Sequence, residues 1–198
     1  MLFPSISDIQ RNLTAVWAVF RGNRDAIRQV DASYEGFWRS FAAIVLLIPL
    51  YIAFVMSEIA VIESRDLIPA EFSPTWHAAV RAISIVIDWV GYPLLMLVMA
   101  RPLGIASRYA TYIAAYNWSS VIISVPLALP GILLGLGMIS TGIAGALMLV
   151  GLAVFVRMRF VVARAALEVS VATAAGLVLL DFLLGLALAE LFDRMTGL

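Results

Sequence analysis

The chain contains five apolar stretches, each about long enough to cross the hydrocarbon core of a bilayer as a helix. They lie near residues 39–60, 79–100, 109–129, 131–155 and 168–190. Hydrophobic residues make up 63% of the chain and charged residues only 13%, so most of its surface needs lipid rather than water as a solvent. The sequence predicts an all-α, polytopic membrane bundle of five transmembrane helices, preceded by an N-terminal amphipathic helix at the membrane interface.

Arginine is distributed unevenly between the two sides of such a bundle. If the N-terminus is cytoplasmic, three arginines face the periplasm: Arg65, Arg81 and Arg194. The other ten are cytoplasmic: Arg11, Arg21, Arg24, Arg28, Arg39, Arg101, Arg108, Arg157, Arg159 and Arg164. Because basic residues concentrate on the cytoplasmic side of membrane proteins, we expect a multi-pass inner-membrane protein with its N-terminus in the cytoplasm and its C-terminus in the periplasm.

Several functional classes find no support in the sequence. The net charge is zero and no block of basic residues is present, whereas nucleic-acid binding requires a basic surface. Cysteine is absent, which removes thiolate nucleophiles and sulfur ligands for metals. We find no metalloprotease, phosphate-loop or nucleophile-elbow motif. We therefore expect no enzymatic activity, no cofactor, no metal and no nucleic-acid partner.

The segment before the first span has the pattern of an amphipathic helix. Between Ile6 and Phe20, apolar residues recur at helical spacing and polar residues occupy the other side. Such a helix either lies in the headgroup plane with its apolar side toward the lipid, which we favour, or docks against the cytoplasmic ends of the bundle. We divide the chain into a cytoplasmic amphipathic segment, 1–37, and a five-span domain, 38–198.

Small residues are concentrated in the fourth apolar stretch. A tight hairpin at Pro126 and Pro130 is expected to connect it to the third stretch. Spacing that brings small residues onto one helix face allows close helix packing. The predicted packing residues are Gly131, Gly135, Gly137, Thr141 and Gly145. The stripe predicts packing within the bundle or, as an alternative, a homodimer or contact with another membrane protein.

Four polar side chains fall inside the predicted spans: Arg81, Asp88, Asn117 and Asp181. A carboxylate in the hydrocarbon region is costly and must face protein or water. Arg81 and Asp88 are seven residues apart, hence on one helix face, so we expect Arg81 to pair with Asp88 or Asp181, with Asn117 facing the same interior. The cluster is interpreted as a structural ion pair, as a proton or ion relay or, least favoured, as side chains that face lipid and extend their charges toward the interface.

The third and last spans carry a family resemblance. The third begins Tyr-Ile-Ala-Ala-Tyr-Asn-Trp-Ser-Ser at Tyr112, and the last contains Arg-Ala-Ala-Leu-Glu-Val and Leu-Leu-Asp-Phe-Leu-Leu up to and beyond Asp181. Together with the short N-terminal segment and the five spans, this resembles the bacterial inner-membrane branch of the Yip (Ypt-interacting protein) domain family over about residues 36–192. Eukaryotic relatives bind small GTPases through a long N-terminal region that has no counterpart here. The resemblance implies the five-span fold but neither GTPase binding nor a site residue.

Two functions fit these observations. The first, which the sequence favours, is a non-enzymatic scaffold or membrane-organising protein. The second is a small transporter or channel subunit with a polar path through the four intramembrane residues. A bundle without a cavity and with every polar group paired favours the scaffold, whereas a cavity that reaches Asp88 or Asp181 favours the transporter.

Overall fold

The computed structural model describes residues 3–64 and 72–197, and this part of the chain contains helices and no strand. The α-helices are α1 (Ile6–Phe20), α2 (Tyr34–Phe41), α3 (Ile48–Glu63), α4 (Pro74–Ala100), α5 (Tyr109–Gly135), α6 (Thr141–Leu167) and α7 (Val171–Thr196). Short 3-10 helices cover Arg24–Gln29, Ala42–Leu47 and Ala106–Arg108. Arg65, one of the three arginines expected on the periplasmic side, lies outside the described residues.

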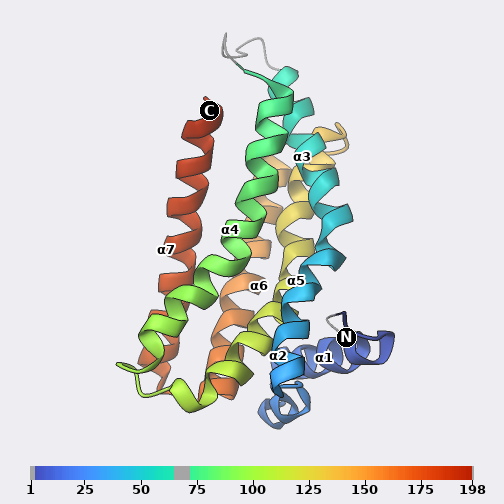
Figure 1. Ribbon diagram of the computed structural model, residues 1–198. Helices are drawn as coiled ribbons and strands as arrows, with labels where there is room; N and C mark the ends of the chain where they lie inside the picture. The colour runs from blue at the N-terminus through green and yellow to red at the C-terminus, as the bar shows by residue number, and fades with distance from the viewer. Residues whose placement is uncertain (1–2, 65–71, 198) are drawn as a thin grey trace.

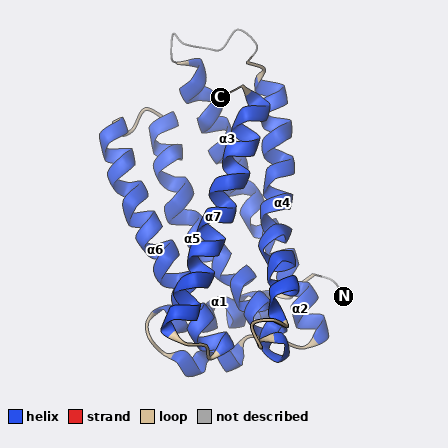
Figure 2. Cartoon of the chain, turned by 90° about the vertical axis from the view of Figure 1, so that its left-hand side faces the viewer, coloured by secondary structure: helices blue, strands red, loops and turns tan. Residues whose placement is uncertain are grey.

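Five helical segments are long and apolar enough to cross a membrane, which confirms the predicted fold class. They are Tyr34–Glu63, Pro74–Ala100, Ala106–Gly135, Thr141–Leu167 and Val171–Thr196. The long helices run up and down beside one another, and the two chain ends lie at opposite ends of the bundle (Figure 1). Helix α1 and the turn between α6 and α7 lie at one end, and the turn between α5 and α6 lies at the other (Figure 2).

The boundary between the third and fourth spans differs from the prediction. Pro126 and Pro130 lie inside α5, which continues to Gly135, and the hairpin turn covers residues 136–140. Prolines are tolerated inside membrane helices because neighbouring groups can satisfy the freed carbonyls, so they do not mark a chain reversal here. The reversal occurs where Gly137 adopts a positive φ of 68° and the Ser140 hydroxyl caps α6.

Helix α1 lies across the end of the bundle and packs its apolar side against α5 and α6 (Figure 1). Ala15, Val16 and Val19 are completely buried. The prediction of a helix over Ile6–Phe20 is confirmed. The side of α1 that carries Val16 docks against α5 and α6, whereas Ile6 and Trp17 of the predicted apolar side are 76% and 44% exposed. The position of this helix in the headgroup plane stays a prediction.

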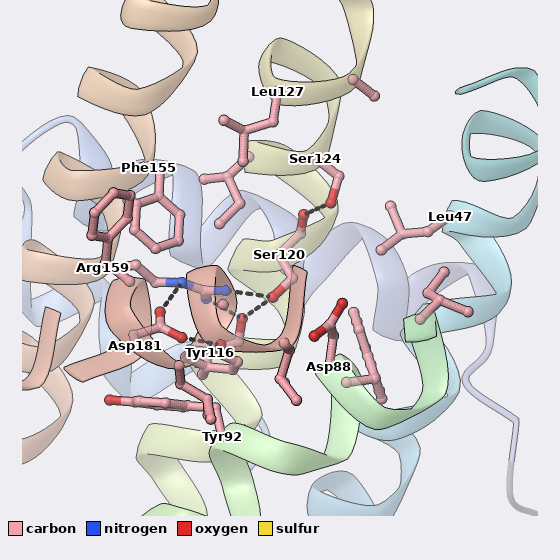
Figure 3. Close-up of a pocket in the computed structure, with 18 of the residues that line it drawn as sticks. Leu47, Asp88, Tyr92, Tyr116, Ser120, Ser124, Leu127, Phe155, Arg159 and Asp181 are labelled. Atoms are coloured by element: carbon pink, nitrogen blue, oxygen red, sulfur yellow. Dashed lines mark hydrogen bonds and ion pairs between the residues drawn. The ribbon is translucent and has the colours of Figure 1, made fainter. Parts of the chain in front are cut away.

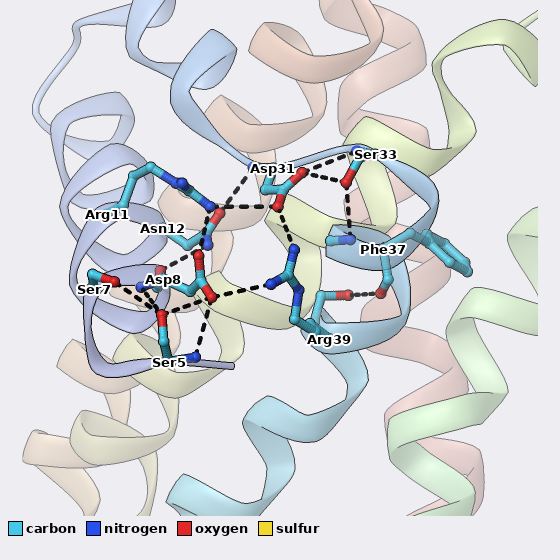
Figure 4. A network of polar contacts seen from close by, with 11 residues as sticks. Ser5, Ser7, Asp8, Arg11, Asn12, Asp31, Ser33, Phe37 and Arg39 are labelled. Atoms are coloured by element: carbon cyan, nitrogen blue, oxygen red, sulfur yellow. Dashed lines mark hydrogen bonds and ion pairs between the residues drawn. The ribbon is translucent and has the colours of Figure 1, made fainter. Parts of the chain in front are cut away.

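A polar network fixes α1 to the start of the first span (Figure 4). Arg39 of α2 forms ion pairs with Asp8 of α1 at 3.2 Å and with Asp31 at 3.1 Å. The buried Asn12 side chain accepts a hydrogen bond from the Asp31 backbone amide. Hydrogen bonds from Ser5 hold the pKa of Asp8 below its usual range. Hydrogen bonds from Ser33 lower the pKa of Asp31 in the same way.

Glycines at two places allow the long helices to approach closely. A Cβ atom added to Gly135 of α5 would lie 2.5 Å from the Ser57 Cβ of α3, and one added to Gly131 would lie 2.8 Å from the Phe54 ring. A Cβ atom on Gly151 of α6 would lie 2.6 Å from the Pro126 carbonyl oxygen of α5. The predicted role of Gly131 and Gly135 in close packing is therefore confirmed, although both belong to the third span.

The remaining small residues of the predicted stripe do not pack in the bundle. Gly137 lies in the turn, and Thr141 and Gly145 are exposed on α6. An added Cβ atom on Gly137 or Gly145 would meet no atom within 4 Å. The prediction that these three residues pack within the bundle is wrong because it assumed that the fourth span begins at residue 131. The alternative, a homodimer through this face, stays a prediction.

Candidate intramembrane binding site

A cavity of about 460 Å³ lies between the transmembrane helices (Figure 3). Each of the helices α3 to α7 contributes to its wall. Most of the lining side chains are apolar, among them Leu50, Phe54, Ile85, Ile123, Leu127, Leu152, Phe155, Phe182 and Leu188. Cavities of this size and character are typical of sites for small apolar or amphiphilic molecules.

An ion pair between α6 and α7 forms the polar end of this cavity. The Arg159 Nε lies 3.1 Å from the Asp181 Oδ2, and the Tyr116 hydroxyl of α5 donates a hydrogen bond of 2.7 Å to Asp181 Oδ1. Arg159 and Asp181 are 6% and 8% exposed. Buried charges are tolerated when they are paired and hydrogen-bonded, as both are here.

Helix α5 supplies the acceptors for the rest of the guanidinium group. Arg159 Nη1 donates to the Tyr116 carbonyl oxygen at 3.0 Å and to the Ser119 hydroxyl at 2.9 Å, and Nη2 donates to the Ser120 hydroxyl at 3.0 Å. The serines follow Tyr116 by three and four residues, which places them beside its carbonyl on the same helix face. Their hydroxyls also donate to that carbonyl oxygen, so the acceptor array is fixed by α5 itself.

Tyrosine rings cover the ion pair on one side. The Arg159 guanidinium carbon lies 3.5 Å from the centre of the Tyr116 ring, in cation–π contact. Tyr92 of α4 stacks on Tyr116 with ring centres 4.6 Å apart, and its hydroxyl lies 2.7 Å from that of Tyr112. The cluster therefore joins α4, α5, α6 and α7.

Asp88 of α4 lies apart from this ion pair but lines the same cavity (Figure 3). Its side chain is exposed, and within residues 3–64 and 72–197 it makes no hydrogen bond or ion pair. Trp89, the next residue, also lines the cavity and donates its indole N–H to the Phe41 carbonyl oxygen. Asp88 is thus a carboxyl group on an otherwise largely apolar wall.

The predicted partnership of Arg81 with Asp88 or Asp181 is wrong. Arg81 lies near the end of the bundle opposite α1, where it pairs with Glu58 of α3 and Asp193 of α7, each at 2.9 Å. The stem of an arginine near a helix end carries its charge toward the interface, where those two acids lie.

Asn117 does not join this site either. It is buried and donates its side-chain amide to the Ser40 hydroxyl at 3.0 Å, which ties α5 to α2. Of the four predicted polar residues, the cavity brings together Asp88 and Asp181 and excludes Arg81 and Asn117.

Arg159 is the central residue that sequence reasoning missed. It was assigned to the cytoplasmic boundary together with Arg157 and Arg164. However, Arg157 and Arg159 are two residues apart on a helix and so project in nearly opposite directions. Because the two side chains project in nearly opposite directions, one of them must point into the bundle. The polar groups of Tyr116 and the two serines in the third span offered acceptors for it, and this combination is the signal that could have identified a buried arginine.

Comparisons of the chain with protein-family models, with curated proteins and with solved structures found no match. Within the described ranges, no three His, Cys, Asp or Glu side chains are grouped so that they could hold a metal ion. The function is therefore inferred from the cavity and its polar residues.

Proposed function

We propose that this protein is a small inner-membrane transporter subunit that binds a lipophilic molecule in the intramembrane cavity. The observation that carries the proposal is the cavity itself, a space of about 460 Å³ with apolar walls that reaches both Asp88 and Asp181. An apolar wall receives the body of such a molecule, and a few polar groups orient it. The proposed role is non-enzymatic and needs no cofactor.

The scaffold interpretation is the less favoured of the two. A purely structural bundle gains most from filled interhelical space, because each void costs packing energy. It also has no use for a carboxyl group without a partner on an apolar wall, since such a group is costly in lipid. The cavity and Asp88 support the transporter interpretation.

We further propose that the end of the bundle carrying α1 faces the cytoplasm. Arg24, Arg28, Arg101 and Arg108 lie in the segments at that end, whereas the opposite end has Arg81 and Arg194 among its described residues. This orientation follows the positive-inside rule. Membership of the Yip domain family remains a proposal that rests on the residues of the third and last spans.

Photo-crosslinking in lipid nanodiscs tests the binding proposal. A long-chain alcohol bearing a diazirine group is expected to label cavity residues such as Leu127 and Phe182, and an excess of unlabelled alcohol should suppress that labelling because the site is saturable. The outward-facing Leu149 and Val150, which are 68% and 59% exposed, are the internal control and should be labelled without saturation. If competition leaves the labelling of Leu127 and Phe182 unchanged, the cavity is only a lipid-filled groove and the proposal fails.

A further inference from the structure

The charges around the cavity are balanced except at one position. Arg159 and Asp181 neutralise each other, and the guanidinium group of Arg159 donates three further hydrogen bonds to acceptors on α5. Asp88 is left as an ionisable group on the wall with neither a hydrogen bond nor an ion pair in the described part of the chain.

No cation among residues 3–64 and 72–197 is free to neutralise Asp88. Arg81 is two helical turns away on the same helix and is held by Glu58 and Asp193. The charged or titratable groups around this part of the cavity are Tyr51 of α3, Arg81 and Tyr92 of α4, Tyr116 of α5, Arg159 of α6 and Asp181 of α7. Each of these six makes a hydrogen bond or an ion pair with another group of the protein.

We propose that the cavity binds a lipophilic cation, an apolar molecule with one positive charge, and that Asp88 is the group that pairs with this charge. The inference rests on the proposed function and names its substrate class. An apolar wall with one unpaired carboxyl group complements such a molecule in both shape and charge. Trp89, which lines the wall next to Asp88, adds an aromatic side chain of the kind that attracts cations.

Proton and cation then compete for the same carboxyl group. When Asp88 is protonated, its carboxyl group is neutral and offers no charge to a cation. Binding of the cation requires the carboxylate, so one proton leaves Asp88 for water as one positive charge enters. The net charge of the cavity is unchanged by the exchange, which couples the binding of the cation to the release of a proton.

Equilibrium binding of tetraphenylphosphonium to the full-length protein in nanodiscs tests this inference. Asp88→Asn keeps the shape of the side chain and removes its charge, and is expected to weaken binding of the cation by about tenfold or more. Wild-type affinity should fall as the pH is lowered, by up to about tenfold per pH unit, because the proton displaces the cation. Thermal unfolding of the Asp88→Asn variant serves as the check that the fold is intact.

A neutral probe of similar shape, triphenylphosphine oxide, separates this inference from the proposed function. It should bind wild type and Asp88→Asn equally and without dependence on pH. If the neutral probe binds but the cation binds both proteins equally, the assignment of Asp88 is wrong and the cavity proposal stands. If neither probe binds the wild-type protein above empty nanodiscs, both proposals are overturned.

Discussion

Arg159 and Asp181 place two opposite charges where both are almost entirely removed from solvent, and three helices meet at them. The depth of Asp181 in the membrane could be predicted from its position in the last apolar stretch. Its partner could not, because hydropathy locates a residue along the membrane normal and does not specify which neighbouring helix it faces. The position of Arg81 along its helix made it a plausible partner for Asp181, but its side chain forms ion pairs with Glu58 and Asp193 instead.

Arg159→Ala is expected to lower the free energy of unfolding by about 3 to 5 kcal/mol, because it leaves Asp181 buried without its counter-charge. The double variant Arg159→Met with Asp181→Leu should recover most of this loss, since no charge is then stranded. Unfolding in mixed micelles titrated with sodium dodecyl sulfate gives the values. Arg28→Ala is the control and should change stability by less than about 1 kcal/mol, because Arg28 forms an ion pair on the surface, 82% exposed. A loss for the double variant as large as that for Arg159→Ala would contradict the account.

At the scale of elements, helix identity was predictable and helix boundaries were less so. The apolar runs of the third and fourth spans are nearly continuous in sequence, and prolines suggested a reversal that occurs only after Gly135. Pro130 has no N–H to donate to the Pro126 carbonyl, and the oxygen of this carbonyl would lie 2.6 Å from a Cβ atom on Gly151 of α6. The approach requires a glycine on α6, which is Gly151.

Gly151→Ala tests this contact between α5 and α6. Its added methyl group would meet the Pro126 carbonyl oxygen at 2.6 Å, so the helices must separate, and we expect a destabilisation of about 1 to 3 kcal/mol. Gly145→Ala on the same helix meets no atom within 4 Å and should leave the free energy of unfolding unchanged or raise it by up to about 1 kcal/mol. Equal effects of the two substitutions would show that the close approach is absent.

The docking of α1 is expected to weaken in acid. The pKa values of Asp8 and Asp31 are lower in the folded chain than the ordinary 3.8, so their contribution to stability is complete above that value and is lost as the pH falls through the folded pKa values. Nitroxide labels on the exposed Thr14 of α1 and Val156 of α6 report the docking. Their distance distribution should be narrow at neutral pH and broaden at about pH 3 and below. A distribution that stays narrow throughout would mean that the carboxylates do not hold α1.

For the molecule as a whole, composition and the five apolar stretches were enough to predict a five-span helical bundle. The cavity could not be predicted from the sequence, because it depends on how α3 to α7 are spaced and rotated, and hydropathy contains no information on either. Asp88 is an example: the sequence singles it out as costly, but only the fold shows that it lines a cavity and makes no hydrogen bond or ion pair with the described residues. Its role therefore had to be argued from the structure.

The orientation in the membrane gives a whole-molecule prediction. With the α1 end in the cytoplasm, a reporter fused to the C-terminus is expected in the periplasm, so alkaline phosphatase should be active there and green fluorescent protein dark. The same reporters inserted in the turn between α4 and α5 should give the opposite result. An active phosphatase in that turn would contradict the proposed topology and show that this turn lies in the periplasm.

The central claim is that the space between the helices is a binding site, and two glycines of α7 allow a direct measurement. Added Cβ atoms on Gly185 and Gly176 meet no atom within 4 Å, but only Gly185 lines the cavity. Gly185→Phe should fill the space and weaken binding of triphenylphosphine oxide, measured by equilibrium dialysis against nanodiscs, by about tenfold or more. Gly176→Phe should bind the probe as the wild-type protein does. Equal affinity of both variants and wild type would contradict the claim.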